Sequence, residues 1–212
     1  MDYDISQPLP SRSIGTQDAE NRRIKCISDE LRRRCGIHEA QPGTSQKSLR
    51  LADPEAQVAE EYAKVNGLWV PMDRIAELGI PGMSGNENEL YVSDDVIFKV
   101  NNLMNTGSIL ALLDKAMMHN ELFPETFYKF YGFTGFGGRS VYPILLQALV
   151  KEAEPAPQIA IDTFMAALGF EKGDRPGRYS NSRYVVWDLL PRNVLRDKDG
   201  DVFVVDAEIK LI

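Results

Sequence analysis

One stretch constrains this chain more than any other, residues 187–206, which read WDLLPRNVLRDKDGDVFVVD. Asn193 follows Asp188 by five residues, and Asp206 follows Asn193 by thirteen, across two apolar segments joined by Asp199-Gly200. An Asp-Gly pair between apolar runs predicts a tight β-hairpin, which would return the second carboxylate to the loop that carries the first. This set of oxygen ligands suits one or two Mg²⁺ ions on the phosphates of a nucleotide, because Mg²⁺ completes its shell with water and phosphate.

A lysine upstream points to the same chemistry. The segment VIFKV places Lys99 between Phe98 and Val100, behind the turn Asp94-Asp95 and a loop that contains two glycines. A lysine on a largely buried strand needs an anionic partner, and a nucleotide phosphate is one. The alternative is an edge strand from which Lys99 extends its amine into solvent, as lysines commonly do.

In the order and type of these residues the chain resembles the protein-kinase-like superfamily. The catalytic loop of that superfamily runs Asp, four residues, Asn, and its metal-binding Asp follows a two-stranded hairpin. Leu189 and Pro191 also stand at their family places in the loop. More narrowly, GNENELYV, FKVNN, HNELFPETFY, and DLLPRNVL through DVFVVDAEI resemble small bacterial kinase-like domains in polyvalent proteins of phages and conjugative elements. The resemblance spans roughly residues 80–209.

The resemblance implies a phosphotransferase that uses ATP and Mg²⁺ and acts on a serine, threonine or tyrosine hydroxyl of an unknown protein substrate. It also implies the following roles: Asp188 and Lys99 are catalytic, Gly82, Ser84, Gly85, Lys99 and Gln147 bind the nucleotide, and Asn193 and Asp206 bind the metal.

The helix expected over residues 106–120 should supply a partner for Lys99, and the sequence offers three candidates for it. They are Asp114, Asn120 and Glu121. The first and last share one flank of the helix, whereas Asn120 falls on its apolar face, where a polar group must find a partner.

Several positions depart from the superfamily. Val186 and Trp187 stand where a histidine and an arginine usually precede the catalytic Asp, and Leu190 replaces the lysine that normally contacts the γ-phosphate, unless Arg192 supplies that contact. Few residues follow Asp206, so we expect no activation loop. A nucleotide-binding interaction module without catalysis therefore remains an alternative. A small-molecule kinase is a third reading, which would normally need a larger helical region.

Composition and charge limit the classes of partner that we expect this protein to bind. The net charge of −7 and the absence of a basic, aromatic-rich face argue against nucleic acid. No apolar run approaches the ~20 residues of a membrane helix, so no membrane partner is expected. The polar N-terminus MDYDISQPLPSRS lacks the features of a secretory signal, which predicts a cytoplasmic protein or an effector translocated without such a signal.

Together these observations predict an α+β protein with a truncated protein-kinase-like fold. It would have an N-lobe antiparallel sheet with one helix, a much reduced C-lobe and an N-terminal helical extension. We expect a flexible tail over residues 1–15, a helical extension over 16–67 with a linker at 37–52, and a minimal kinase-like domain over 68–212. A first helix over 17–35 follows from apolar residues at spacings of three and four.

Overall fold

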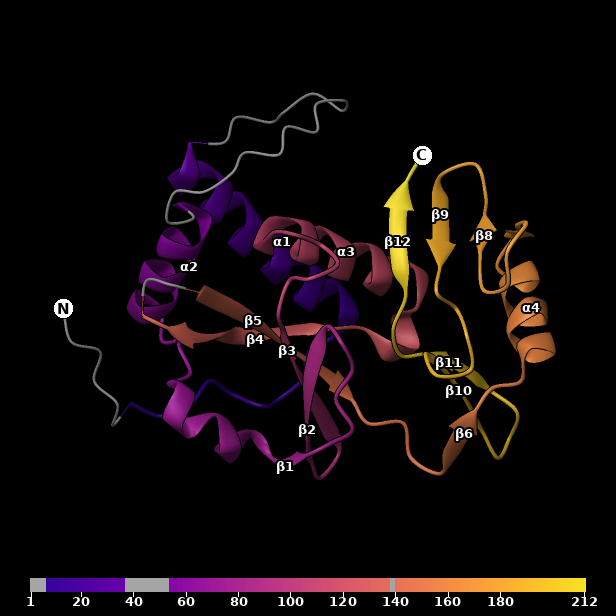
Figure 1. Ribbon diagram of the computed structural model, residues 1–212, viewed down its shortest axis with the longest axis horizontal. Helices are drawn as coiled ribbons and strands as arrows, with labels where there is room; N and C mark the ends of the chain where they lie inside the picture. The colour runs from indigo at the N-terminus through magenta and orange to yellow at the C-terminus, as the bar shows by residue number, and fades with distance from the viewer. Residues whose placement is uncertain (1–6, 37–53, 138–139) are drawn as a thin grey trace. The chain divides into compact units, whose positions relative to one another are not determined.

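A computed structural model describes residues 7–36, 54–137 and 140–212 (Figure 1). The expected linker at 37–52 lies outside the described residues, as do the first six residues of the expected tail. The chain divides into two units: unit 1 comprises Met1–Asp114 and Tyr128–Gln147, and unit 2 comprises Lys115–Phe127 and Ala148–Ile212. The fold is mixed α and β, with antiparallel strand pairs in both units.

Unit 1 is built on a five-stranded sheet with the order β1-β2-β3-β5-β4. The strands are β1 (Ile80–Pro81), β2 (Asn88–Ser93), β3 (Val96–Asn101), β4 (Lys129–Phe136) and β5 (Ser140–Ala148). The expected turn Asp94-Asp95 joins β2 to β3 in a hairpin: Ser93 pairs with Val96, and Asp94 takes a positive φ of 49°. Because β2 and β5 flank β3, the strand of Lys99 is an interior strand, and the alternative of an edge strand is wrong.

Two helices from the N-terminal part of the chain pack on this unit. The helix α1 (Gln17–Cys35) matches the predicted range; Thr16 caps its start by accepting from the Ala19 amide, and Gly36 ends it in the left-handed conformation. The helix α2 (Pro54–Val65) packs against α1, and both contact β4. A 3₁₀ helix, η1 (Met72–Leu78), contacts β2 and β4.

Residues 7–15 belong to the segment for which composition predicted a flexible tail, yet they make specific contacts with unit 1. Leu9 and Ile14 pack against its core. Arg12 donates to the Ser93 hydroxyl at 2.8 Å, and the buried amine of Lys129 donates to two backbone carbonyls of this segment at 2.6 and 2.5 Å. These long-range contacts have no local sequence signal, which is why composition alone suggested a tail.

Unit 2 contains two small sheets and the helix α4 (Gln158–Ala167). One sheet has the order β11-β10-β6 and the other β12-β9-β8-β7. The strands are β6 (Ala153–Pro155), β7 (Glu171–Lys172), β8 (Tyr179–Ser180), β9 (Tyr184–Trp187), β10 (Val194–Asp197), β11 (Val202–Val204) and β12 (Glu208–Leu211). The core of unit 2 includes Ile161, Met165, Tyr179, Val186 and Val204.

The helix α3 (Ile109–Leu122) begins in unit 1 and ends in unit 2, and the 3₁₀ helix η2 (Pro124–Thr126) follows it. The helix expected over residues 106–120 therefore begins three residues later and ends two residues later than predicted. None of the helices that the structure describes combines the length and apolar composition needed to cross a membrane.

Candidate functional site

The loop between β9 and β10 carries the first two predicted site residues. Asp188 follows β9 directly and adopts a positive φ of 63°, a conformation that costs most residues energy but that aspartate tolerates better than most. The buried Leu189 next to it donates its amide to the Gly177 carbonyl at 3.1 Å, which ties the loop to the segment that precedes β8 in the same unit. A non-glycine residue held in this region is a mark of functional sites.

Asn193 closes the same loop onto Asp188. Its side-chain amide nitrogen donates to the Asp188 carboxylate and to the Asp188 backbone carbonyl, each at 2.8 Å. Because the nitrogen is directed at Asp188, the side-chain carbonyl oxygen of Asn193 is the atom that remains to bind a cation. Arg192 forms an ion pair with the other carboxylate oxygen of Asp188.

The third predicted residue is brought to this loop by the β10–β11 hairpin. The strands pair from Val194↔Val204 to Arg196↔Val202, with Gly200 in the turn at a φ of 93°. As a result the backbone carbonyl of Asn193 accepts the backbone amides of Val205 at 2.9 Å and of Asp206 at 3.3 Å. The structure therefore places Asp188, Asn193 and Asp206 at one end of unit 2.

Pairing of β12 with β9 supports the same arrangement. Glu208 lies opposite Trp187 in the register, so the residues just before Asp188 and just after Asp206 run side by side (Figure 1). The Asp206 carboxylate also accepts the Ala207 amide at 2.9 Å, which fixes its orientation, and the side chain is 28% exposed.

Two residues of this site were missed by the sequence reasoning. The buried amine of Lys115, on α3, lies 2.7 Å from the Glu208 carboxylate and 3.7 Å from the Asp206 carboxylate. Lys115 and Glu208 are 93 residues apart, so only the fold joins them. The signal that could have found Lys115 is its place on α3, three residues after the buried Leu112, where a charge needs a partner.

The nucleotide-binding candidates of unit 1 are centred on Lys99. Its side chain is 6% exposed, and its amine lies 3.1 Å from the Tyr128 hydroxyl and 5.0 Å from the centre of the Tyr128 ring. Gln147, at the end of β5, is fully buried. The lysine therefore does not extend into solvent, in contrast to the alternative considered from the sequence.

The loop between β1 and β2 carries the other three nucleotide-binding candidates. The amides of Gly82 and Gly85 donate to backbone carbonyls of Leu90 and Asn88 at 2.8 and 3.1 Å, and the Ser84 hydroxyl accepts the Leu90 amide at 3.3 Å. Both Ser84 and Gly85 are exposed. The loop is thus folded back on β2 by its own backbone and presents exposed residues at its tip.

A buried carboxylate braces the far end of this loop. Glu87 is 7% exposed and accepts the side-chain amides of Asn101 at 3.1 Å and Asn105 at 2.8 Å, while its carbonyl accepts the Asn102 amide at 2.9 Å. These bonds join the end of the loop to the end of the lysine strand β3, so the loop and Lys99 share one support.

Two of the three candidate partners of Lys99 are engaged by other cations. Within unit 1, Asp114 accepts two bonds from Arg32 at 2.8 and 2.7 Å. Within unit 2, Glu121 accepts from Arg183 at 2.6 Å and from the Tyr184 hydroxyl at 2.8 Å. Burial, and then the Glu121 carboxylate, raise the pKa of Tyr184 to about 12.

The third candidate, Asn120, is fully buried on α3. Among the residues that the structure describes, no three of the types His, Cys, Asp and Glu converge as a metal site. A metal at Asn193 and Asp206 would therefore take the rest of its shell from phosphate and water.

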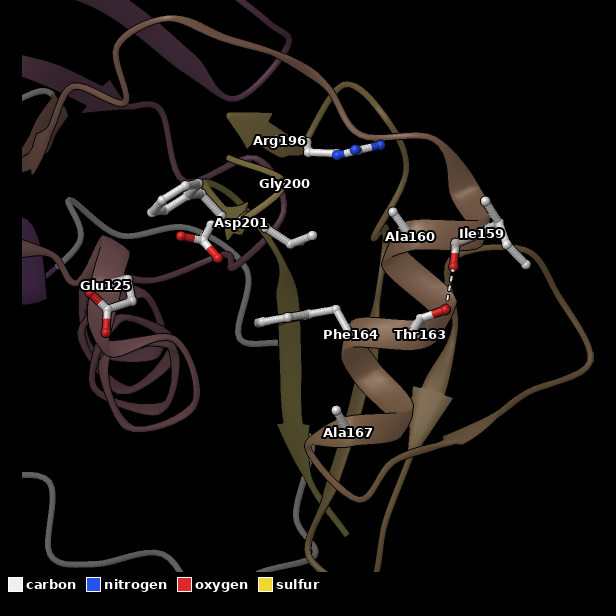
Figure 2. A pocket seen from close by; sticks show the side chains of 11 residues that line it. Glu125, Ile159, Ala160, Thr163, Phe164, Ala167, Arg196, Gly200 and Asp201 are labelled. Carbon is white, nitrogen blue, oxygen red and sulfur yellow. Dashed lines mark hydrogen bonds between the residues drawn. The ribbon is translucent and has the colours of Figure 1, made fainter. Parts of the chain in front are cut away.

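A groove of about 750 Å³ lies on unit 2, between α4 and the β10–β11 hairpin (Figure 2). Phe164 points into it from α4, and Ile159 at its rim is 73% exposed. Glu125 and Asp201, both exposed, lie on the side opposite α4. The groove thus combines an apolar wall with two carboxylates and the guanidinium of Arg196, and it adjoins the hairpin that follows Asn193 and precedes Asp206.

The loop, the hairpin and the lysine strand define a protein of the kinase-like class. A comparison with protein families matches residues 52–212 to the family described as Serine/Threonine/Tyrosine Kinase found in polyvalent proteins. This match covers well over half of the chain, and the chain belongs to that family, as its motifs predicted. A comparison with curated proteins finds no match.

Proposed function

We propose that this protein is a phosphotransferase that moves the γ-phosphoryl group of ATP to a hydroxyl group of a protein. The observation that supports this most is the meeting of Asp188, Asn193 and Asp206 at one end of unit 2, with Asn193 bonded to both neighbours. Phosphoryl transfer needs little covalent chemistry from the protein and depends on positioning and on cations around the transferring group.

In this proposal Asn193 and Asp206 hold Mg²⁺. The donor set fits the ion, since an amide oxygen and a carboxylate oxygen are hard ligands and few in number. The bound ion would neutralise charge on the phosphates. The chain's own part is to hold the two oxygens in place, which the bonds from Asn193 to Asp188 and from Ala207 to Asp206 do.

Asp188 orients the acceptor hydroxyl and receives its proton. The acceptor oxygen forms a bond to the γ-phosphorus, the bond from that phosphorus to the bridging oxygen of ADP breaks, and the hydroxyl proton passes to the carboxylate. Arg192 must release Asp188 for this step; its side chain is 64% exposed, so the pair is weak and readily exchanged. Once released, Arg192 can supply a cation to the phosphates.

Lys99 binds the phosphates from unit 1, with Gly82, Ser84 and Gly85 covering them and Gln147 next to the adenine. The burial of Lys99 supports this role, since the charge of a lysine that is 6% exposed is stabilised by a nearby anion.

The groove on unit 2 supports a protein acceptor. Its apolar wall, with Glu125, Asp201 and Arg196 around it, suits a polypeptide that carries an apolar side chain beside charged ones. Charge complementarity of this kind sets specificity more than affinity.

The proposal is tested with the variants Lys99→Met and Asp206→Asn. Each is expected to abolish transfer of radiolabelled γ-phosphate, in autophosphorylation or to an acceptor, while the circular dichroism spectrum stays unchanged. Lys210→Met, which removes an exposed lysine of β12, is the matched control and should keep full activity. Unchanged transfer in Lys99→Met or Asp206→Asn would refute the assignment.

A second function, nucleotide binding without catalysis, is favoured by two observations. Arg192 occupies the Asp188 carboxylate, and Leu190 stands where a lysine would contact the γ-phosphate. If this is the function, Mg-ATP will raise the melting temperature of the wild-type protein but no phosphate will be released or transferred. The thermal shift and the transfer assay together separate the two functions.

A further inference from the structure

Gln158, the first residue of α4, contacts the backbone of the loop that carries Asp188. Its side-chain amide nitrogen donates to the carbonyl of the buried Leu189 at 3.3 Å and to the Tyr179 hydroxyl at 3.0 Å. The same nitrogen lies 3.4 Å from the Asp162 carboxylate, the longest of the three distances. An amide nitrogen carries two hydrogens, so the two shorter contacts account for both of them. All five residues belong to unit 2.

The neighbours of Gln158 fix the direction in which its amide points. The Tyr179 hydroxyl donates to one oxygen of the Asp162 carboxylate at 2.6 Å, and the Lys172 amine donates to the other at 2.6 Å. Burial, and then the bond to Asp162, raise the pKa of Tyr179, so its hydroxyl stays protonated and its oxygen accepts from Gln158. Both partners of the Gln158 side chain are thus acceptors, and its nitrogen, not its oxygen, faces the Leu189 carbonyl.

The amide of Leu189 is held from a second segment. It donates to the Gly177 carbonyl at 3.1 Å, so both backbone polar groups of this fully buried residue are bonded to other parts of unit 2. The approach of the two segments is close: a Cβ atom at position 177 would lie 2.9 Å from the Leu189 carbonyl oxygen and 3.0 Å from Leu190 Cδ2. Gly177 also has a φ of 71°, so glycine suits this position on both grounds.

Leu189 directly follows Asp188, whose φ of 63° requires support from its surroundings. A non-glycine residue persists in this conformation where the structure around it fixes it. Within the loop, the Asp188 carbonyl accepts the Leu190 amide at 2.9 Å and the side-chain amide of Asn193 at 2.8 Å. These bonds shape the loop, whereas the bonds of Leu189 tie it to α4 and to the segment before β8.

We infer that Gln158 is a positioning residue: by donating to the Leu189 carbonyl it holds the loop so that the Asp188 carboxylate points where the acceptor hydroxyl binds. Tyr179 acts one step further away, because its hydroxyl orients the amide of Gln158. The inference rests on the proposed function for the role of Asp188.

The test uses the full chain with Gln158→Met, which keeps a side chain of similar length and helix propensity but has no group to donate. The control is Ile161→Val, which removes one methyl group from a fully buried side chain of the same helix. It weakens packing without touching the Leu189 carbonyl. The readouts are the rate of γ-phosphate transfer at saturating Mg-ATP, the Kd of Mg-ATP from calorimetry, and hydrogen exchange of residues 188–193 without nucleotide.

In Gln158→Met we expect the transfer rate to fall about tenfold or more, since a small displacement of a catalytic group has effects of this size. The Kd of Mg-ATP should stay at the wild-type value, because the β10–β11 hairpin still holds Asn193 and Asp206 together. Hydrogen exchange of residues 188–193 should become faster. Ile161→Val should leave all three readouts unchanged at temperatures well below its melting temperature.

A double-mutant cycle tests the part of Tyr179. Tyr179→Phe keeps the aromatic ring in the core and removes the hydroxyl, so it should slow transfer to a smaller extent than Gln158→Met. Added to Gln158→Met, it should slow transfer no further, because the amide that it orients is gone. Effects of the two substitutions that simply add would show that Tyr179 does not act through Gln158.

Three results would overturn the inference: a wild-type transfer rate in Gln158→Met, a loss no larger than that of Ile161→Val, or a Kd of Mg-ATP that rises as much as the rate falls. If Gln158→Met does not fold, Tyr179→Phe is measured by the same three readouts and decides. A wild-type protein that transfers no phosphate would remove the proposed function, while hydrogen exchange of residues 188–193 would still report whether Gln158 holds the loop.

Discussion

Replacing Asp188 by asparagine should separate catalysis from stability, because the two depend on different properties of this side chain. Asparagine tolerates the left-handed conformation that Asp188 adopts at a φ of 63°, so the backbone is not strained further. It also keeps an oxygen that can accept from Asn193. What is lost is the negative charge.

The cost in stability can be worked out from the contacts. The ion pair with Arg192 is between side chains that are 64% and 36% exposed, and such pairs contribute about 0.2–1 kcal/mol. The bond from Asn193 changes from charge-assisted to neutral, a loss of about 1 kcal/mol. The free energy of unfolding should therefore fall by about 1–2 kcal/mol, and the melting temperature by about 2–8 °C.

The effect on transfer should be far larger. Removing a general base slows a reaction by about 10²–10⁴-fold, which corresponds to about 3–5 kcal/mol in activation free energy. The assay is transfer of radiolabelled γ-phosphate at saturating Mg-ATP, with thermal unfolding measured on the same samples. Asp174→Asn, at an exposed position of unit 2, is the control and should change neither quantity.

A variant Asp188→Asn that keeps more than about half of the wild-type rate would refute the role of this carboxylate as base. A fall in melting temperature well beyond the calculated range would show that the charge itself is needed to build the loop. In either case the reasoning from the contacts would be wrong.

Three further predictions concern other parts of the chain. Hydrogen bonds from Lys172 and then Tyr179 hold the pKa of Asp162 below its ordinary value of 3.8, so this carboxylate stabilises the fold above that pH and its contribution is lost as the pH falls below it. Asp162→Asn should therefore flatten the dependence of unfolding free energy on pH in this acidic range. Glu87→Gln should lower the unfolding free energy by about 1–3 kcal/mol in urea denaturation, because the buried carboxylate accepts the side-chain amides of both Asn101 and Asn105 and glutamine keeps only one acceptor oxygen. Ile159→Asp should raise the KM for a protein acceptor, because it puts a charge on the apolar wall of the groove, and should leave the Kd for Mg-ATP unchanged. If the substitution raises both quantities equally, it acts by disturbing the fold and not by weakening the binding of the acceptor.

The elements that the sequence predicted well are those specified by neighbours in the chain. The helix at 17–35 follows from the spacing of Ile24, Ile27 and Leu31 and from Gly36 as its stop. The hairpin after Asn193 follows from Asp199-Gly200 between two apolar runs. In these segments the side chains that determine the structure lie within one or two turns of one another, so local preference and tertiary structure agree.

The candidate partners of Lys99 show where such reasoning stops. The sequence left Asp114, Asn120 and Glu121 as alternatives. In the structure Asp114 bonds Arg32, 82 residues away, and Glu121 bonds Arg183, 62 residues away. The contacts of residues 7–15 with Ser93 and Lys129 likewise join residues that are 81 and 118 positions apart in the sequence. No local pattern encodes partners at that separation, because they are selected by how whole elements pack.

By itself, then, the sequence determined the chemistry that this protein carries: a carboxylate, an amide and a second carboxylate at fixed spacing, and a lysine in an apolar strand. Only the tertiary structure decided that Lys99 is buried on an interior strand and that Lys115 and Glu208 join the site. The physical reason is that burial and long-range pairing of charges depend on the packing of distant elements, whereas turns, caps and ligand spacing depend on adjacent residues.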